Sequence, residues 1–335
     1  MSATKTIVWF RQDLRIHDNP ALLAAVKAGD IFPIYILDDV NSGDWAMGAA
    51  SRLWLHESLG SLNASLNGQL CFFDGDAQTV LMDLVAELGA TAVHWNRCYE
   101  PWRIGRDKKI KTQLSDKGVE VNSYNGSLLW EPWEIIKKDG TPYKVYSPFF
   151  KRGCLAASHQ IRQVLPAPKN INYLALPQGF ASHSLEELRL KPSIAWDGGI
   201  RKAWSVGEDA AHDRLQRLID RRLKGYKKGR DFPAANKVSR LSPHLHWGEI
   251  SPQQVWEAIQ HTPPSSNTDH FLSELGWRQF SYYLLYHFPK LPTDNFNPKF
   301  DAFTWHHRPK QLALWQKGLT GYPIVDAAMR ELYQT

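Results

Sequence analysis

The chain has 335 residues, of which 43% are hydrophobic and 22% charged, and its net charge is +6. No stretch approaches the roughly 20 apolar residues of a membrane-spanning helix, and the N-terminus lacks the layout of a signal peptide, so we expect a cytoplasmic protein with no membrane partner. Its 3 cysteines, Cys71, Cys98 and Cys154, are scattered, which argues against a disulfide framework and a structural zinc site.

Strand and helix patterns alternate along the first 130 residues. We expect strands over 5–10, 31–37, 69–73, 91–96 and 119–125, because these are short apolar runs. Helices are expected between them, the first with Asn19 as N-cap and Pro20 at its first position. Parallel strands joined by helical crossovers predict a doubly wound, Rossmann-like α/β domain with a five-stranded parallel sheet. No GxGxxG follows the first strand, so an ordinary dinucleotide-binding site is not expected.

The alternation ends after residue 130. Proline, glycine and aromatic clusters fill 131–195, which we interpret as a long connector. From 196 onward only helical patterns occur. We therefore predict three parts: an α/β domain over 1–130, a connector over 131–195 and an all-α domain over 196–335.

Several segments together resemble the DNA photolyase/cryptochrome family, most closely its class I bacterial cyclobutane pyrimidine dimer photolyases. They are TIVWFRQDLRIHDNPAL at the start, YSPFFKR at 146–152, SRLSPHLHWGEISP at 239–252, ELGWRQF at 274–280 and TGYPIVDAAMREL at 320–332. The order and spacing of these segments carry the resemblance over nearly the whole chain. Family members continue well beyond the last segment, so the resemblance implies a C-terminally truncated chain with an incomplete flavin domain.

The resemblance implies FAD as the cofactor of the helical domain. It carries flavin contacts onto these residues: Tyr226, Val238, Ser239, Arg240, Leu241, Ser242 and Phe271. The residues themselves suit the phosphate side of such a site, because two serine hydroxyls and successive backbone N–H groups can bind an anion. Without the other segments, the same stretch would be interpreted as a helix cap.

The helical pattern over 271–289 places Glu274 and Trp277 one turn apart on one face. An indole offers a flat surface on which an extruded base can stack. The resemblance gives Glu274 and Trp277 the catalytic role of holding a flipped pyrimidine dimer, with the carboxyl group acting electrostatically. It adds Arg230 and Arg278 as DNA-backbone contacts, which position a lesion without reading sequence. The implied partner is damaged DNA, bound by a monomer in the cytoplasm at the nucleoid.

Three further assignments follow from the resemblance. Trp305 takes the outer position of the electron-transfer relay, while the inner tryptophans and the residue beside the flavin N5 would lie beyond residue 335. A second, antenna chromophore is implied in the α/β domain, either a folate or a deazaflavin. Where folate-binding relatives carry Asn–Glu, this chain has Trp102–Arg103. No metal is expected, because the histidine pairs lack a third ligand at suitable spacing.

The function predicted from these residues is light-dependent repair of cyclobutane pyrimidine dimers by a deoxyribodipyrimidine photo-lyase. Three alternatives stay open. The first is a cryptochrome-type photoreceptor, which shares the fold and does not repair DNA. The second is a photolyase specific for 6–4 photoproducts. The third is an inactive fragment that binds DNA weakly.

Overall fold

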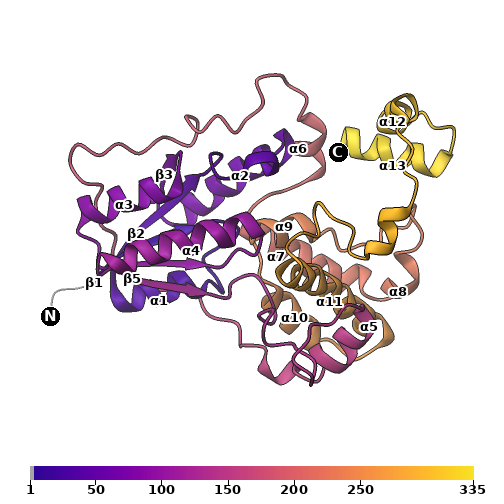
Figure 1. Ribbon diagram of the computed structural model, residues 1–335, viewed down its shortest axis with the longest axis horizontal. Helices are drawn as coiled ribbons and strands as arrows, with labels where there is room; N and C mark the ends of the chain where they lie inside the picture. The colour runs from indigo at the N-terminus through magenta and orange to yellow at the C-terminus, as the bar shows by residue number, and fades with distance from the viewer. Residues whose placement is uncertain (1–3) are drawn as a thin grey trace. The chain divides into compact units, whose positions relative to one another are not determined.

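The computed structural model describes residues 4–335, and one parallel sheet organises its N-terminal part (Figure 1). The strands are β1 (Thr4–Phe10), β2 (Gly29–Leu37), β3 (Cys71–Asp74), β4 (Ala92–Asn96) and β5 (Glu120–Tyr124). They lie in the order β3-β2-β1-β4-β5, and every neighbouring pair is parallel. The predicted five-stranded, doubly wound sheet is confirmed.

Helices cover both faces of this sheet. The strands are nearly continuous apolar runs, so apolar side chains point to both faces and both must be buried. They are α1 (Pro20–Ala28), α2 (Ala49–Ser65), α3 (Ala77–Leu88) and α4 (Pro101–Asp116), with a 3₁₀ turn η1 (Gly43–Trp45) before α2. Ile7 and Trp9 of β1 are fully buried in the core cluster that α3 and α4 share with the sheet. Asn19 caps α1 as predicted, since its side chain accepts from the Leu22 N–H at 3.1 Å.

The segment 131–195 contains little regular structure, yet its first half is packed into the protein. It forms α5 (Tyr146–Pro148), a π-helical turn η2 (Phe149–Cys154) and a 3₁₀ turn η3 (Ser158–Gln160). Phe149 and Phe150 are buried in a second hydrophobic core made with the later helices. The second half runs beside the sheet, where the Leu174 N–H donates to the Ile31 carbonyl at 2.8 Å and His183 bridges to Phe72.

Helices account for the regular structure after residue 196, as predicted. They are α6 (Gly198–Ala203), α7 (Glu208–Arg217), the π-helical turn η4 (Leu218–Arg222), α8 (Tyr226–Gly229), α9 (Ser242–Trp247), α10 (Pro252–Gln260), α11 (Ser266–His287), the 3₁₀ turn η5 (Pro298–Ala302), α12 (Pro309–Gln316) and α13 (Pro323–Gln334). The long helix α11 begins with a reciprocal capping box between Ser265 and Thr268, which satisfies two free backbone donors.

The chain forms two compact units. The first comprises residues up to 191 together with 206–289, and it contains the sheet, the connector and helices α7 to α11. The second comprises 192–205 and 290–335. In this unit the Trp204 indole donates to the Thr335 carbonyl at 3.2 Å, and Asp326 accepts from the Thr320 N–H at 2.8 Å. The compact units divide the chain after residues 191, 205 and 289. The domain boundaries expected at 130 and 195 stay a prediction.

Within residues 4–335, no helix has both the length and the apolar character that crossing a membrane requires.

Gly248 fixes the approach of α9 to the loop after β1. It has a φ of +68° and ends α9, and a Cβ added there would overlap the backbone of Gln12 and Asp13. The neighbouring Trp247 carbonyl accepts from the Leu14 N–H at 3.1 Å. Only glycine permits this contact between the sheet domain and the helices.

We expect Gly248→Ala to lower the free energy of unfolding by more than Gly118→Ala does. Gly118 also has a positive φ, of +78°, but an added Cβ would meet nothing within 4 Å. In the control, the free energy of unfolding falls only by the cost of a side chain in the left-handed region, about 1–2 kcal/mol. In Gly248→Ala it falls by a further 1–3 kcal/mol, roughly the cost of a steric clash. Urea denaturation measures both, and equal losses would contradict a close approach at Gly248.

Candidate functional site

The backbone over 238–242 has the geometry of an anion-binding nest. Arg240 adopts a left-handed φ of +57°, and Leu241 follows with right-handed angles of −90° and −9°. Such alternation turns successive N–H groups to one side, where they can bind a phosphate. Val238 and Ser242 are exposed, whereas the Leu241 side chain is buried and the Leu241 N–H donates to the Ser239 Oγ at 3.4 Å. This geometry fits the diphosphate of FAD.

Four arginines gather around this nest. The Arg222 Nη1 donates to the Val238 carbonyl at 2.9 Å. Burial, and then the like charges of Arg240 and Arg217, lower the pKa of Arg222. Burial and the guanidinium groups of Arg222, Arg217 and Arg240 likewise lower the pKa of Arg214. A bound diphosphate would offset this repulsion between like charges.

The three cations of this cluster that come from α7 and η4 were not among the predicted site residues. In the sequence, Arg214, Arg217 and Arg222 belong to a run of charges that is indistinguishable from an exposed helix face. The three arginines come together because η4 packs against the segment that carries Val238. A contact between two segments of this kind cannot be predicted from the local sequence pattern.

The short helix α8 packs against α11 and brings predicted flavin and DNA residues together. The rings of Tyr226 and Phe271 meet edge to face with centroids 5.3 Å apart, and both side chains are buried. One helical turn further along α11, Glu274 forms an ion pair with Arg230. The His270 Nε2 lies 3.8 Å from the same carboxylate oxygen of Glu274. Flavin contacts of Tyr226 and Phe271 stay a prediction.

Trp277 lies one turn beyond Glu274 on α11 and keeps 47% of its surface exposed. The Tyr146 ring stacks on its indole, with centroids 3.6 Å apart and planes 11° from parallel. A hollow of about 670 Å³ opens beside Tyr146. Two lysines, Lys151 and Lys227, line this hollow together with Ser273 of α11. The surface is therefore aromatic at Trp277, and the hollow beside it carries two lysines and one carboxylate, Asp269.

Arg278 follows Trp277 in the sequence but is engaged within the protein. Its Nη1 donates to the Ser127 carbonyl at 2.7 Å and its Nη2 to the Leu245 carbonyl at 3.2 Å. The guanidinium also lies 4.8 Å from the centre of the Tyr282 ring. This geometry joins three segments of the fold and does not favour the DNA-backbone contact predicted for Arg278.

Trp305, the predicted outer relay residue, belongs to the second compact unit and is 74% exposed. Its indole meets the Phe303 ring edge to face, with centroids 4.9 Å apart. Its role in electron transfer stays a prediction. Across residues 4–335, no group of three or more histidine, cysteine, aspartate or glutamate side chains could hold a metal ion.

The carboxyl ends of β1, β2 and β4 are filled by arginine and tryptophan side chains. Arg11 forms an ion pair with Asp107, and Arg106 pairs with Asp38 at 2.9 Å. Both guanidinium groups lie 4.7 Å from the centre of the Trp9 ring. The remaining space, lined also by Trp102 and Arg103, is about 30 Å³.

That volume is roughly the share of one liquid water molecule, whereas small-molecule pockets usually measure about 300–1,000 Å³. Ligands of doubly wound sheets ordinarily bind at these strand ends. With the side chains in these positions, the space at the strand ends is smaller than a folate or a deazaflavin needs, and the antenna chromophore stays a prediction.

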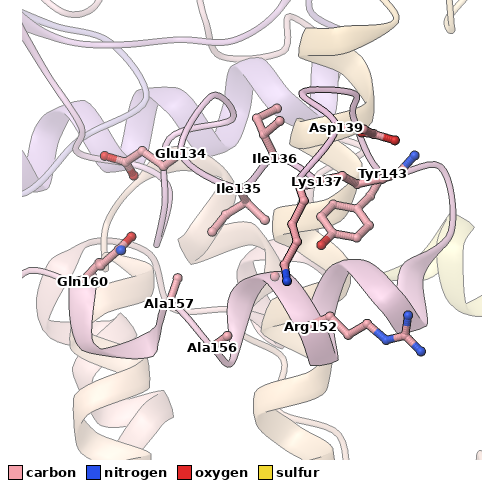
Figure 2. A pocket seen from close by; sticks show the side chains of 12 residues that line it. Glu134, Ile135, Ile136, Lys137, Asp139, Tyr143, Arg152, Ala156, Ala157 and Gln160 are labelled. Carbon is pink, nitrogen blue, oxygen red and sulfur yellow. The ribbon is translucent and has the colours of Figure 1, made fainter.

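A separate pocket of about 690 Å³ lies on the connector (Figure 2). Figure 2 shows the Lys137 side chain beside the Tyr143 ring, reaching toward the segment that carries Arg152 and Ala156. The Lys137 ammonium donates to the Thr141 hydroxyl at 3.0 Å. No predicted site residue lines this pocket, so the candidate site is the α8–α11 surface with the nearby arginine cluster.

Comparison with known proteins gives two family matches, DNA photolyase over residues 6–169 and the FAD binding domain of DNA photolyase over 271–335. The chain is 43% identical to the deoxyribodipyrimidine photo-lyase of Agrobacterium fabrum, with 100% of the chain and 70% of that protein covered. It is 35% identical to cryptochrome-2 of Arabidopsis thaliana, with 99% of the chain covered and 56% of that protein, little more than half of its length.

A crystal structure of a bacterial class III photolyase from Agrobacterium tumefaciens is also similar. Its TM-score is 0.93 at 42% identity, with 100% of this chain and 70% of that chain covered. The resemblance in the sequence pointed to class I, so the class of this chain stays a prediction. The nest over 238–242 lies outside both family matches, and its geometry is independent support for a phosphate site.

We expect Arg222→Ala to weaken FAD binding about tenfold or more, because a hydrogen bond to a charged group contributes about 1.5–3 kcal/mol. Arg221→Ala is the matched control, since Arg221 is the exposed neighbour on η4. Titration of each variant with FAD, followed by flavin fluorescence at two salt concentrations, measures the difference. An equal loss in both variants would show that the arginine cluster does not bind the diphosphate.

Proposed function

This chain belongs to the DNA photolyase family, and we propose that it repairs cyclobutane pyrimidine dimers in DNA by light-driven electron transfer from reduced FAD. The observation that carries the proposal is the position of Glu274 and Trp277. They lie one turn apart on α11, one in contact with Arg230 and the other with Tyr146. A carboxylate beside a half-exposed indole suits an extruded pyrimidine, which needs both stacking and an edge contact.

Two features support FAD as the cofactor. The backbone at Arg240 and Leu241 has the alternating dihedral angles of an anion-binding nest, and the arginine cluster offers positive charge to the diphosphate. Family membership supports the same cofactor, because one of the two matches is an FAD binding domain. When bound, reduced FAD supplies the electron that light excites.

Trp277 is proposed to hold the lesion by stacking. Base–aromatic stacking contributes about 1–3 kcal/mol per base, and 47% of the Trp277 surface is exposed. Stacking does not depend on base identity, which suits an enzyme that meets its lesion in any sequence. Trp277 therefore supplies affinity for the extruded dimer.

Glu274 is proposed to fix the edge of the dimer. Both of its ion-pair contacts, to Arg230 and His270, use Oε1. Among the described residues, Oε2 has no protein partner, so it can accept a hydrogen bond from an N–H on the pyrimidine edge. Arg230 beside it stabilises negative charge that arrives on the dimer, since a preorganised cation acts strongly in a partly buried site.

Basic side chains around this surface support a DNA partner. Arg230 is half-buried beside Glu274, and Lys151 and Lys227 line the adjoining hollow. Such cations bind phosphates without reading the base sequence. We propose that the protein acts as a monomer on damaged DNA in the cytoplasm. The antenna chromophore, a folate or a deazaflavin, stays a prediction.

The test is a repair assay with a defined oligonucleotide that contains one thymine cyclobutane dimer. The protein, loaded with FAD and reduced under anaerobic conditions, is illuminated with blue light while dimer loss is followed by chromatography. We expect repair in light and none in the dark. Bound flavin without repair would favour the cryptochrome-type photoreceptor, and repair of a 6–4 photoproduct alone would favour that specificity.

We expect Glu274→Ala to lower the repair yield per absorbed photon about tenfold or more, because one preorganised polar contact is removed. Glu274→Gln should keep a larger part of the yield, since its amide can still hydrogen-bond the pyrimidine edge. The yield is measured at saturating DNA, so that weaker binding does not mask the effect. An unchanged yield in Glu274→Ala would exclude a catalytic role for this residue.

A further inference from the structure

The stacking of Tyr146 on Trp277 is closer than ordinary aromatic contacts. Aromatic pairs in proteins usually have centroids about 4.5–7 Å apart, whereas these two lie 3.6 Å apart with planes 11° from parallel. Tyr146 comes from the connector and Trp277 from α11. Because Tyr146 covers one face of the indole, a base can stack only on the other face.

The hydroxyl group of Tyr146 ties its ring to α11 itself. It donates to the Ser273 carbonyl at 2.5 Å and lies 2.7 Å from the Ser273 Oγ. Ser273 is the residue before Glu274 and precedes Trp277 by four positions, one helical turn. Burial raises the pKa of Tyr146 to about 12, so the hydroxyl keeps its proton at neutral pH. The ring is thus held to the helix that carries both lesion-contacting residues.

Gly276 makes this arrangement possible. A Cβ added there would overlap the Phe150 ring and would lie 2.8 Å from the Tyr146 hydroxyl oxygen. Phe150 is buried and its ring is 10° from parallel to that of Tyr146, at 5.6 Å between centroids. The glycine between Glu274 and Trp277 therefore lets the connector press its aromatic side chains onto α11.

We propose that Tyr146 is a positioning residue of the lesion site, which holds the Trp277 indole in one orientation with a single face open to an extruded base. The inference rests on the proposed repair function. Its physical basis is entropy: a side chain that is already ordered does not lose its rotamer freedom when the ligand binds. Ordering one such side chain changes affinity by roughly 2- to 12-fold.

The test compares Tyr146→Ala, Tyr146→Phe and Trp277→Ala in binding to a dimer-containing oligonucleotide and to the undamaged sequence, in the dark. We expect Tyr146→Ala to lower the preference for the dimer, which is the ratio of the two affinities, by roughly 2- to 12-fold. Tyr146→Phe keeps the stacked ring and should retain most of the preference. In the double variant Tyr146→Ala/Trp277→Ala, the loss should not exceed that of Trp277→Ala alone, because the two residues act as a unit.

A second measurement needs no DNA. The protein is labelled with 5-fluorotryptophan, and the ¹⁹F resonance of Trp277 is identified by its absence in Trp277→Phe. We expect one narrow line in the unmodified chain and a shifted, broadened line in Tyr146→Ala. An unchanged line, or additive losses in the double variant, would overturn the role of Tyr146.

The two measurements separate the inference from the proposed function. If the unmodified chain shows no preference for dimer-containing DNA, the lesion site and its use by Tyr146 are both overturned, whatever the ¹⁹F line does. If the preference exists and Tyr146→Ala leaves it intact, only the role of Tyr146 is overturned. Thermal unfolding of each variant shows whether a loss comes from the fold.

Discussion

The packing of α8 on α11 is the contact on which the rest of the site depends. The Arg230–Glu274 ion pair marks this contact, but both side chains are about 30% exposed, and such pairs contribute only about 0–1 kcal/mol. The buried rings of Tyr226 and Phe271 contribute more, about 1.5–3 kcal/mol for each large side chain removed from water. Apolar packing therefore holds the two helices together, and the ion pair sets the direction in which Glu274 points.

Because buried apolar residues hold the helices together, the polar surface above them can be well ordered without being buried. Glu274 and Trp277 stand on a helix that enters the second core through residues such as Leu275 and Phe280, and the Phe280 ring meets the Trp277 indole edge to face with centroids 6.1 Å apart. The connector adds Tyr146 from outside that helix. The exposed residues are thus positioned by buried neighbours and by one aromatic contact, which leaves their remaining faces available to a ligand.

Much of the architecture was predictable from the sequence. The five strands are short apolar runs separated by helices, and Asn19 and Pro20 start α1 as the pattern predicts. The spacing of Glu274 and Trp277 also followed from helical periodicity. The contribution of the connector did not, because Tyr146 and Phe150 lie in a segment rich in proline and aromatic residues that has no repeating pattern.

The arginine cluster was likewise not predictable from the sequence. Periodicity places Arg214 and Arg217 three residues apart on α7, yet it cannot say that η4 brings Arg222 to the Val238 carbonyl. Nor could the sequence show that arginines and tryptophans fill the strand ends, since charged residues there are equally typical of an open ligand site. Both outcomes depend on contacts between segments far apart in the chain.

The central claim is that α11 presents a pyrimidine dimer to reduced flavin. The most direct measurement is the fluorescence lifetime of reduced FAD bound to the protein, with dimer-containing and with undamaged DNA of the same sequence. Electron transfer to a dimer held at this surface predicts a shorter lifetime with the dimer and no change with undamaged DNA. An equal lifetime with both DNAs, at saturating concentrations, would contradict the account.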